Sequence, residues 1–246
     1  MNSMTRDKAL QYARYRLPYS IEASKFVIET ANVSQGIIAD IGSGTGLLTQ
    51  HFVGEVEKVF AIEPEFEMRK ISYELMKQRE GIEYIDGVAE ETSLPDQSID
   101  LIVAANAYHR FNPEAAIKEF ARILKPQGWL AIFSYYDDHN FFRDTMLVCN
   151  IAQYNERLAA TRHQEPVTYF YGDSAPHRFL FKQEHYETWD EYWGAVVSGM
   201  EAPDESEDWF EIFQEAHKQR FNKIASNGQI TVRYSTEVWL GQPKYG

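Results

Sequence analysis

The segment from Ile37 to Leu48 constrains the fold more than any other stretch of the chain. It begins with a run of apolar residues, as expected for a strand buried on both faces of a parallel sheet. Three glycines follow at alternate positions, at 42, 44 and 46, and a helical pattern over residues 47–53 comes next. Glycine permits positive φ angles and lets a ligand approach the main chain closely. A strand, a tight glycine turn and a helix N-terminus together predict a site for a nucleotide cofactor.

The spacing of the glycines excludes two familiar phosphate-binding loops. A P-loop needs Gly-Lys-Ser/Thr after four intervening residues, but no lysine follows Gly46. The dinucleotide fingerprint G-x-G-x-x-G would place its third glycine at position 47, which is Leu47. The pattern is instead D-x-G-x-G-x-G, and Asp40 supplies its acid.

This pattern resembles the first motif of the class I S-adenosylmethionine-dependent methyltransferases. In that family the acid at the position of Asp40 lies near the amino-acid part of the cofactor. The glycine loop, here Gly42, Ser43, Gly44 and Gly46, passes beneath it. The resemblance is strongest over about residues 36–135, and it implies S-adenosylmethionine as the cofactor.

A second strand, predicted over residues 58–62, ends at Glu63 and Pro64. A carboxylate at this position can accept two hydrogen bonds from ribose hydroxyls. Glu63 lies 17 residues beyond Gly46, close to the usual spacing of about 20 for that role. Pro64 suits the first turn of a helix running to about Gln78. The ribose role fits NAD as well as S-adenosylmethionine, so it does not choose between them.

A third strand, at residues 82–85, leads into the acidic loop 86–95. This loop resembles the adenine-contacting loop of the family. The resemblance implies that the Ala89 N–H contacts the adenine ring and that Glu90 accepts from its exocyclic amine. An ordinary solvated acidic loop is the alternative for Glu90.

The fourth strand, predicted over residues 100–106, ends at Ala105 and Asn106. In the family this end lies beneath the sulfonium of the methyl donor. His109 follows it and is the candidate catalytic residue, either contacting the acceptor as a general base or positioning it. A purely structural histidine is the alternative. Asn112 then caps the next helix, residues 125–128 are predicted as a turn, and residues 129–133 as the fifth strand.

Two helices precede the first strand, one over residues 3–16 and one from the Ser20 cap to about Ala31. The Y-R-x-P-Y segment between them resembles one found in the small-molecule branch of the family, where it lies over the cofactor. The resemblance implies that Arg16 pairs with the cofactor carboxylate and that Tyr12 packs on the cofactor. A surface arginine beside a packed tyrosine is the alternative.

After residue 135 the pattern changes. We predict a helix over residues 143–158, an irregular aromatic stretch over 165–181, helices near 189–193 and over 208–225, and a strand over 229–240. The expected fold class is α/β, a doubly wound, mostly parallel seven-stranded Rossmann-like sheet with a C-terminal helical and aromatic lid insertion. The single domain, residues 1–246, divides into N-terminal helices over the cofactor (1–34), the cofactor-binding core (35–137), the substrate lid (138–200), and a helix with the final strand (201–246).

Composition narrows the partners. The net charge of −13 argues against a nucleic-acid backbone as ligand. No apolar run approaches the roughly 20 residues that span a bilayer, and the N-terminus lacks a signal-peptide core. Cys149 is the single cysteine, so we expect no intrachain disulfide, no cysteine metal cluster, no metal and a cytoplasmic location. The expected partner is a small molecule, and the sequence leaves the oligomeric state open.

Together these features predict a methyltransferase that transfers a methyl group in line from S-adenosylmethionine to a small molecule, at a carboxylate or a hydroxyl. Two rivals stay open at this point. One is a non-catalytic S-adenosylmethionine-binding regulatory protein. The other is an NAD-dependent oxidoreductase, against which the glycine spacing argues.

Overall fold

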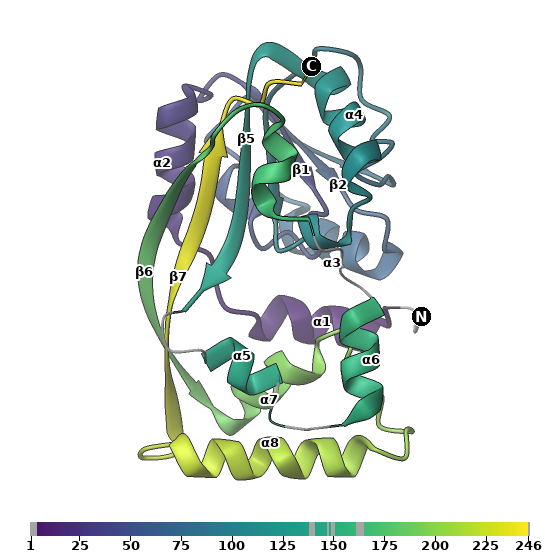
Figure 1. Ribbon diagram of the computed structural model, residues 1–246, viewed down its shortest axis with the longest axis vertical. Helices are drawn as coiled ribbons and strands as arrows, with labels where there is room; N and C mark the ends of the chain where they lie inside the picture. Colours follow the sequence, from purple (N-terminus) through teal and green to yellow (C-terminus); the bar gives the residue numbers. More distant parts are fainter. Residues whose placement is uncertain (1–3, 138–140, 147, 149–150, 161–164, 246) are drawn as a thin grey trace.

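The computed structural model describes residues 4–137, 141–146, 148, 151–160 and 165–245. A seven-stranded sheet in the order β3-β2-β1-β4-β5-β7-β6 forms its centre (Figure 1). The strands are β1 (Ile37–Ile41), β2 (Lys58–Ile62), β3 (Ile82–Ile85), β4 (Ile99–Ala105), β5 (Leu124–Tyr136), β6 (His177–Thr188) and β7 (Gln229–Gly241). The α-helices are α1 (Arg6–Tyr15), α2 (Ile21–Ala31), α3 (Phe66–Met76), α4 (Pro113–Ile123), α5 (Phe141–Met146), α6 (Ala152–Ala160), α7 (Trp189–Val197) and α8 (Phe210–Ile224). Single 3₁₀ turns are η1 (Thr49–His51), η2 (Tyr108–Arg110) and η3 (Val167–Tyr171).

The sheet confirms the predicted fold class. β1 pairs in parallel with β2 and β4, and β2 with β3 and β4 with β5 also pair in parallel. β7 runs antiparallel to both of its neighbours, β5 and the edge strand β6. The chain leaves β1 toward β2 on one side, and β4 lies on the other side. The crevice outside the carboxyl ends of β1 and β4 is therefore the switch point where such sheets bind ligands.

Alternate residues of the central strands pack against helices on opposite faces of the sheet. Ile38 faces the helix α2, whose Ala23 and Val27 are fully buried. Its neighbour Ala39 faces α4 together with Phe120. Because both faces are covered, β1 is apolar except for Asp40, as expected for a parallel strand in such a sheet.

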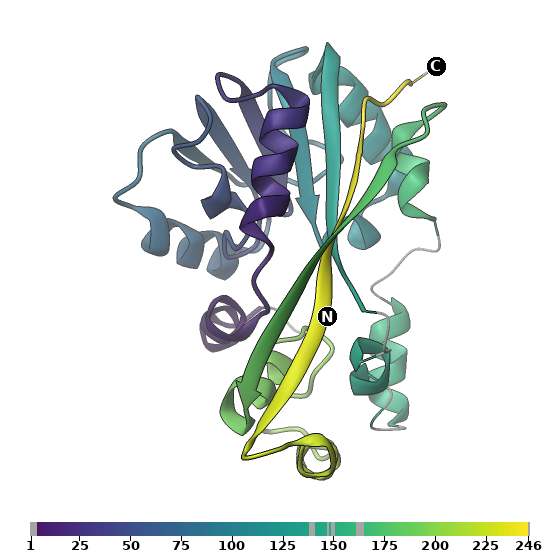
Figure 2. The same ribbon diagram turned by 90° about the vertical axis from the view of Figure 1, so that its left-hand side faces the viewer.

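A second group of helices lies beyond the carboxyl edge of the parallel strands. Figure 1 shows α1, α5, α6, α7 and α8 below the downward-pointing end of β5. The long strands β6 and β7 continue from the sheet into this group and connect it to the core (Figure 2). The helices therefore border the edge where the switch point lies.

The predicted α-helix over residues 47–53 is wrong. The segment forms only the 3₁₀ turn η1. Few residues separate Gly46 from Gly54, both at positive φ, and β-branched Thr49 and Val53 have low helix propensity. Leu48 and Phe52 are buried in the core instead.

Other boundaries also differ from the predictions. The predicted turn at 125–128 lies within β5, next to a register shift between Ile99 and Leu101 of β4. Residues 177–181, predicted as irregular and part of the lid, begin the sheet strand β6. The predicted helix over 143–158 is two helices, α5 and α6. Cys149 lies outside the described residues.

The sequence predicts no membrane-spanning segment and no metal site, and the structure bears on both predictions only within its described residues. In that part of the chain, no helix is long and apolar enough to cross a membrane. No group of three or more His, Cys, Asp or Glu side chains there is arranged to hold a metal ion.

Candidate active site

The glycine loop after β1 lies at the switch point of the sheet. Its three glycines have φ angles of 71°, 57° and 82°. A Cβ at Gly42 would lie 2.6 Å from the Cβ of Ala107, and one at Gly46 would lie 2.4 Å from Met76 Cε. A Cβ at Gly44 would meet no atom within 4 Å. The first and third glycines therefore allow tight packing, whereas the second borders open space that a ligand can approach.

The main-chain N–H groups of this loop are tied to the end of β2. Gly42 and Ser43 donate to the carbonyl of Ile62 at 2.9 and 3.0 Å. The Gly44 N–H donates to Glu63 Oε2 at 2.8 Å. The sequence predicted a helix N-terminus directly after this loop. That prediction is wrong, because the segment forms only the 3₁₀ turn η1, and the N–H groups of Gly42, Ser43 and Gly44 bond within the protein.

Asp40 is 1% exposed and lies under the loop. Its Oδ2 accepts from the Thr49 hydroxyl at 2.6 Å, and its Oδ1 is buried without a hydrogen-bond partner in the described structure. Burial raises the pKa of Asp40 to about 7 despite the Thr49 hydrogen bond, and the charge of Glu63 adds to the increase. The Thr45 hydroxyl is also buried there without such a partner. A polar ligand that approaches Gly44 would give these two buried atoms hydrogen-bond partners.

Glu63 stands at the end of β2, as the sequence predicts. Its two carboxylate oxygens accept from the Gly44 and Glu65 N–H groups, at 2.8 and 2.9 Å. Burial raises its pKa against these two hydrogen bonds. Each oxygen keeps acceptor capacity, since a carboxylate has about four lone-pair sites. Arg69 donates to the Glu63 carbonyl and forms an ion pair with Asp86 at 2.8 Å. The neighbouring Pro64 is exposed.

The loop that we assigned to the adenine is fixed by α4. The Thr92 N–H donates to Glu119 at 2.8 Å, and Ala89 is 3% exposed. The Glu90 carboxylate accepts from the N–H of Asn112, the N-cap of α4. Glu90 thus already has a partner within the protein, which the sequence did not indicate.

Asn106 follows Ala105, the last residue of β4, and connects the sheet to the N-terminal segment. It has a φ of 48°, and its N–H donates to the Phe133 carbonyl at 2.9 Å. Its side-chain amide donates to the hydroxyl of buried Tyr19 at 2.9 Å. The Tyr19 ring stacks on Tyr135, with centroids 4.9 Å apart. The Asn106 side chain therefore contacts the protein's own N-terminal segment.

The same segment carries Arg16 and Tyr12. The Arg16 guanidinium lies 4.7 Å from the centre of the Tyr12 ring. Its Nε donates to the Ser198 hydroxyl, at the end of α7, at 3.1 Å. The structure thus brings the two predicted residues together. Their contact with the cofactor stays a prediction.

His109 lies in the turn η2 after β4, half-buried, with its ring 5.9 Å from that of Tyr108. A cavity of about 440 Å³ opens beside Tyr108 at the carboxyl end of β5. Ser134 and Arg178 in its wall both donate to Glu237. Its volume is in the range of small-molecule sites.

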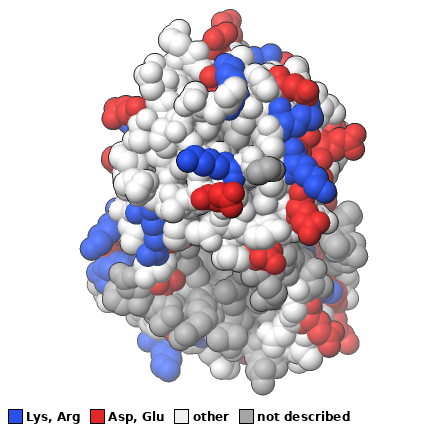
Figure 3. All heavy atoms as spheres, turned by 45° about the horizontal axis from the view of Figure 1, so that its top comes forward, with Lys and Arg blue, Asp and Glu red and all other residues white. Residues whose placement is uncertain are grey.

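Charges on the molecular surface are mixed. On the face drawn in Figure 3, Lys and Arg side chains lie among Asp and Glu side chains and form no continuous basic surface. This view agrees with the net charge of −13.

Several residues at the site escaped the sequence analysis. Thr45 and Thr49 were assigned only to a turn and a helix, although Thr49 bonds Asp40 directly. The position of these two hydroxyl side chains, within and just after the glycine loop, was the signal that could have placed them at the site. Tyr19 and Tyr135 are far apart in sequence, and no sequence pattern shows that they stack.

Part of the chain is similar in sequence to known proteins. Residues 39–132 match the model of a methyltransferase domain family. An uncharacterized methyltransferase of Mycobacterium bovis is 35% identical over 121 residues, 49% of this chain and 47% of that protein. The ubiquinone/menaquinone biosynthesis C-methyltransferase of Shewanella pealeana is 31% identical over 119 residues, 45% of this chain and 47% of that protein. The chain spans about half the length of the curated relatives it matches.

Solved structures share the fold over most of the chain. A protein of Anabaena variabilis, described as a methyltransferase from an antibiotic biosynthesis pathway, has a TM-score of 0.61 at 19% identity, covering 92% of this chain and 98% of that one. The YcgJ protein of Bacillus subtilis has a TM-score of 0.59 at 18% identity, covering 92% and 100%. With the glycine loop and the sheet order, these findings support a class I S-adenosylmethionine-dependent methyltransferase domain over residues 39–132, in a chain that shares the fold of these solved structures.

Proposed function

We propose that this protein transfers the methyl group of S-adenosylmethionine to a small-molecule acceptor. The observation that carries the proposal is the cradle at the switch point. There, an open glycine lies close to Glu63 and beside Asp40 Oδ1 and the Thr45 hydroxyl, two atoms that are buried without a hydrogen-bond partner among the described residues. An NAD-dependent oxidoreductase is not favoured, since the matched family and the named relatives are methyltransferases.

The residues of the cradle suit the parts of this cofactor. In this proposal Asp40 pairs with the ammonium group, Glu63 accepts from the ribose hydroxyls, and the Ala89 N–H contacts the adenine. Arg16 pairs with the cofactor carboxylate, and Tyr12 packs beside it. When bound, the cofactor supplies a methyl group on a sulfonium, which is intrinsically reactive toward a nucleophile.

The protein's own contribution is to hold the acceptor in line with that methyl group and to exclude water. The cavity beside Tyr108 is where we place the acceptor, because it opens at the carboxyl end of β5, next to the end of β4. A carboxylate acceptor needs no base. A hydroxyl acceptor must lose a proton, and His109 in the adjacent turn is our candidate to accept it.

The test is transfer of labelled methyl from S-adenosylmethionine to a panel of small carboxylic acids and phenols. We expect His109→Ala to lower kcat with a phenolic acceptor by about 100-fold or more, the scale of general-base catalysis. With a carboxylic acid, kcat is expected to stay near that of the native protein.

The matched control is His177→Ala, which removes an exposed histidine from β6. An equal loss with both acceptor classes, or none with the phenol, contradicts the role of His109. Absence of transfer to every acceptor, with the cofactor bound, favours the regulatory alternative.

A further inference from the structure

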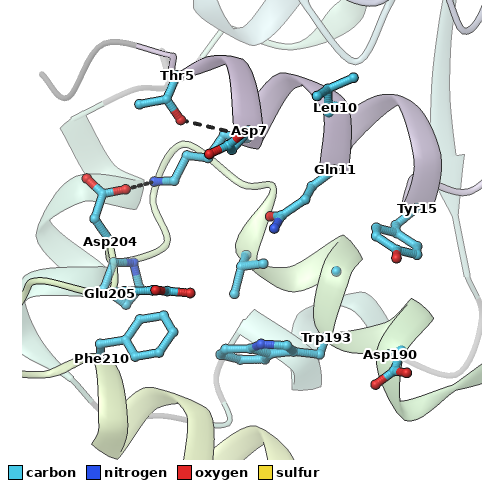
Figure 4. Close-up of a pocket in the computed structure, with 14 residues that line it drawn as sticks. Thr5, Asp7, Leu10, Gln11, Tyr15, Asp190, Trp193, Asp204, Glu205 and Phe210 are labelled. Atoms are coloured by element: carbon cyan, nitrogen blue, oxygen red, sulfur yellow. Dashed lines mark hydrogen bonds and ion pairs between the residues drawn. The ribbon is translucent and has the colours of Figure 1, made fainter.

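A cavity of about 650 Å³ lies between α1 and the helices α7 and α8 (Figure 4). Gln11 and Tyr15, four residues apart, line it from one face of α1, whereas Tyr12 lies on the neighbouring face and is contacted by Arg16, the C-cap of the helix. Its lining includes neither the glycine loop nor Glu63. The cavity is therefore separate from the cofactor cradle.

One wall of the cavity is aromatic. The indole of Trp193 stacks on that of Trp189, with centroids 5.6 Å apart and planes at 8°. Phe210 meets Trp193 edge-on at 5.8 Å. Figure 4 shows Gln11 and Tyr15 extending from α1 toward the side where Trp193 and Phe210 lie. The electron-rich faces of such rings attract cations within about 6 Å.

The cavity also carries excess negative charge. Its lining contains the acids Asp7, Asp190, Asp204 and Glu205 and one base, Lys8. The Lys8 ammonium has partners within the protein, since it pairs with Asp204 at 2.9 Å and donates to the Ala202 carbonyl at 3.1 Å. Asp190 and Glu205 form no ion pair with any residue in the described ranges, and Figure 4 shows them near opposite ends of the aromatic wall.

We propose that this cavity binds a small organic ammonium ion with an aromatic or apolar body. Its volume suits a small molecule. The apolar body would pack on Trp193 and Phe210, and Asp190 or Glu205 would neutralise the ammonium. An anion would meet uncompensated carboxylates, so charge as well as shape selects the ligand.

The test is calorimetric titration of the full chain with phenethylammonium, 2-phenylethanol and phenylacetate at low ionic strength. These probes share the phenyl ring and differ in charge. We expect the ammonium to bind about five-fold or more tightly than the alcohol, with no detectable binding of the anion. Added salt should weaken the ammonium alone.

The double variant Asp190→Asn, Glu205→Gln removes both charges from exposed positions and is expected to bind phenethylammonium about five-fold more weakly. Glu211→Gln, an exposed acid on α8 outside the cavity, is the matched control and should bind as the native protein does. The proposal is overturned if the ammonium fails to bind, if the alcohol binds equally well, or if the control variant loses as much affinity.

Discussion

At the scale of single residues, Glu63 carries the clearest prediction. Its carboxylate both holds the Gly44 N–H and faces the proposed ribose position. We expect Glu63→Ala to weaken binding of S-adenosylhomocysteine by about 1–3 kcal/mol, through lost hydrogen bonds. Calorimetric titration measures this change, with Glu65→Gln, an exposed neighbour, as the control. Unchanged affinity in Glu63→Ala means that the ribose lies elsewhere.

The raised pKa of Asp40 predicts that folding stability and cofactor affinity depend on pH. Burial raises its pKa from 3.8 to about 7 in spite of the Thr49 hydrogen bond. The folded state therefore holds this proton between about pH 4 and 7, and the contribution of Asp40 to stability falls as the pH rises through that range. An ammonium group pairs only with the ionised form. Affinity for S-adenosylhomocysteine should thus rise about tenfold from pH 6 to pH 8.

The variant Asp40→Asn tests whether the pH dependence of S-adenosylhomocysteine binding comes from Asp40. It should bind weakly and with little pH dependence over the same range, measured by the same titration. The pKa of the neighbouring Glu63 is also raised by burial, so a pH dependence that persists in Asp40→Asn belongs to Glu63 and contradicts our assignment.

At the scale of elements, the N-terminal segment is held on the sheet by several contacts. Tyr19 accepts from Asn106, and Tyr135 donates to the Leu17 carbonyl. Tyr234 donates to the carbonyl of Pro18 at 2.8 Å. These contacts fix the position of Arg16 and Tyr12, which lie on the adjoining part of the segment. Cofactor affinity should therefore depend on them.

We expect Tyr19→Phe to weaken binding of S-adenosylhomocysteine several-fold, because the segment loses one anchoring hydrogen bond worth about 1 kcal/mol. The matched control is Tyr171→Phe, a buried tyrosine whose hydroxyl donates to the Trp239 carbonyl at 2.6 Å, outside the proposed cofactor site. Both variants should lower the melting temperature, but only Tyr19→Phe should lower cofactor affinity. Equal affinities in the two variants contradict the anchoring role.

The sequence predicts elements well where a local signal exists. Ser20 and Asn112 cap their helices as expected, since each side chain accepts from the N–H three residues on. The helix after Gly46 was mispredicted because tertiary burial of Leu48 and the Thr49–Asp40 bond outweigh a short apolar pattern. Strand β6 was not predicted, because its pairing with β7 joins segments far apart in the chain.

At the scale of the whole molecule, the succession of apolar strands with intervening helical segments predicts a doubly wound, mostly parallel sheet, and the structure confirms this fold class. The contacts between the N-terminal segment, β4 and β5 were not predictable, because no local pattern encodes a hydrogen bond between Asn106 and Tyr19. The cavity between α1, α7 and α8 likewise depends on distant segments coming together.

The most direct test of the central claim is calorimetric titration of the purified protein with S-adenosylhomocysteine, with NAD as the control. We predict that S-adenosylhomocysteine binds in the micromolar range or tighter, about −8 kcal/mol, and that NAD does not bind. Binding of NAD alone, or of neither ligand, would contradict the assignment of the cradle at Asp40, Gly44 and Glu63.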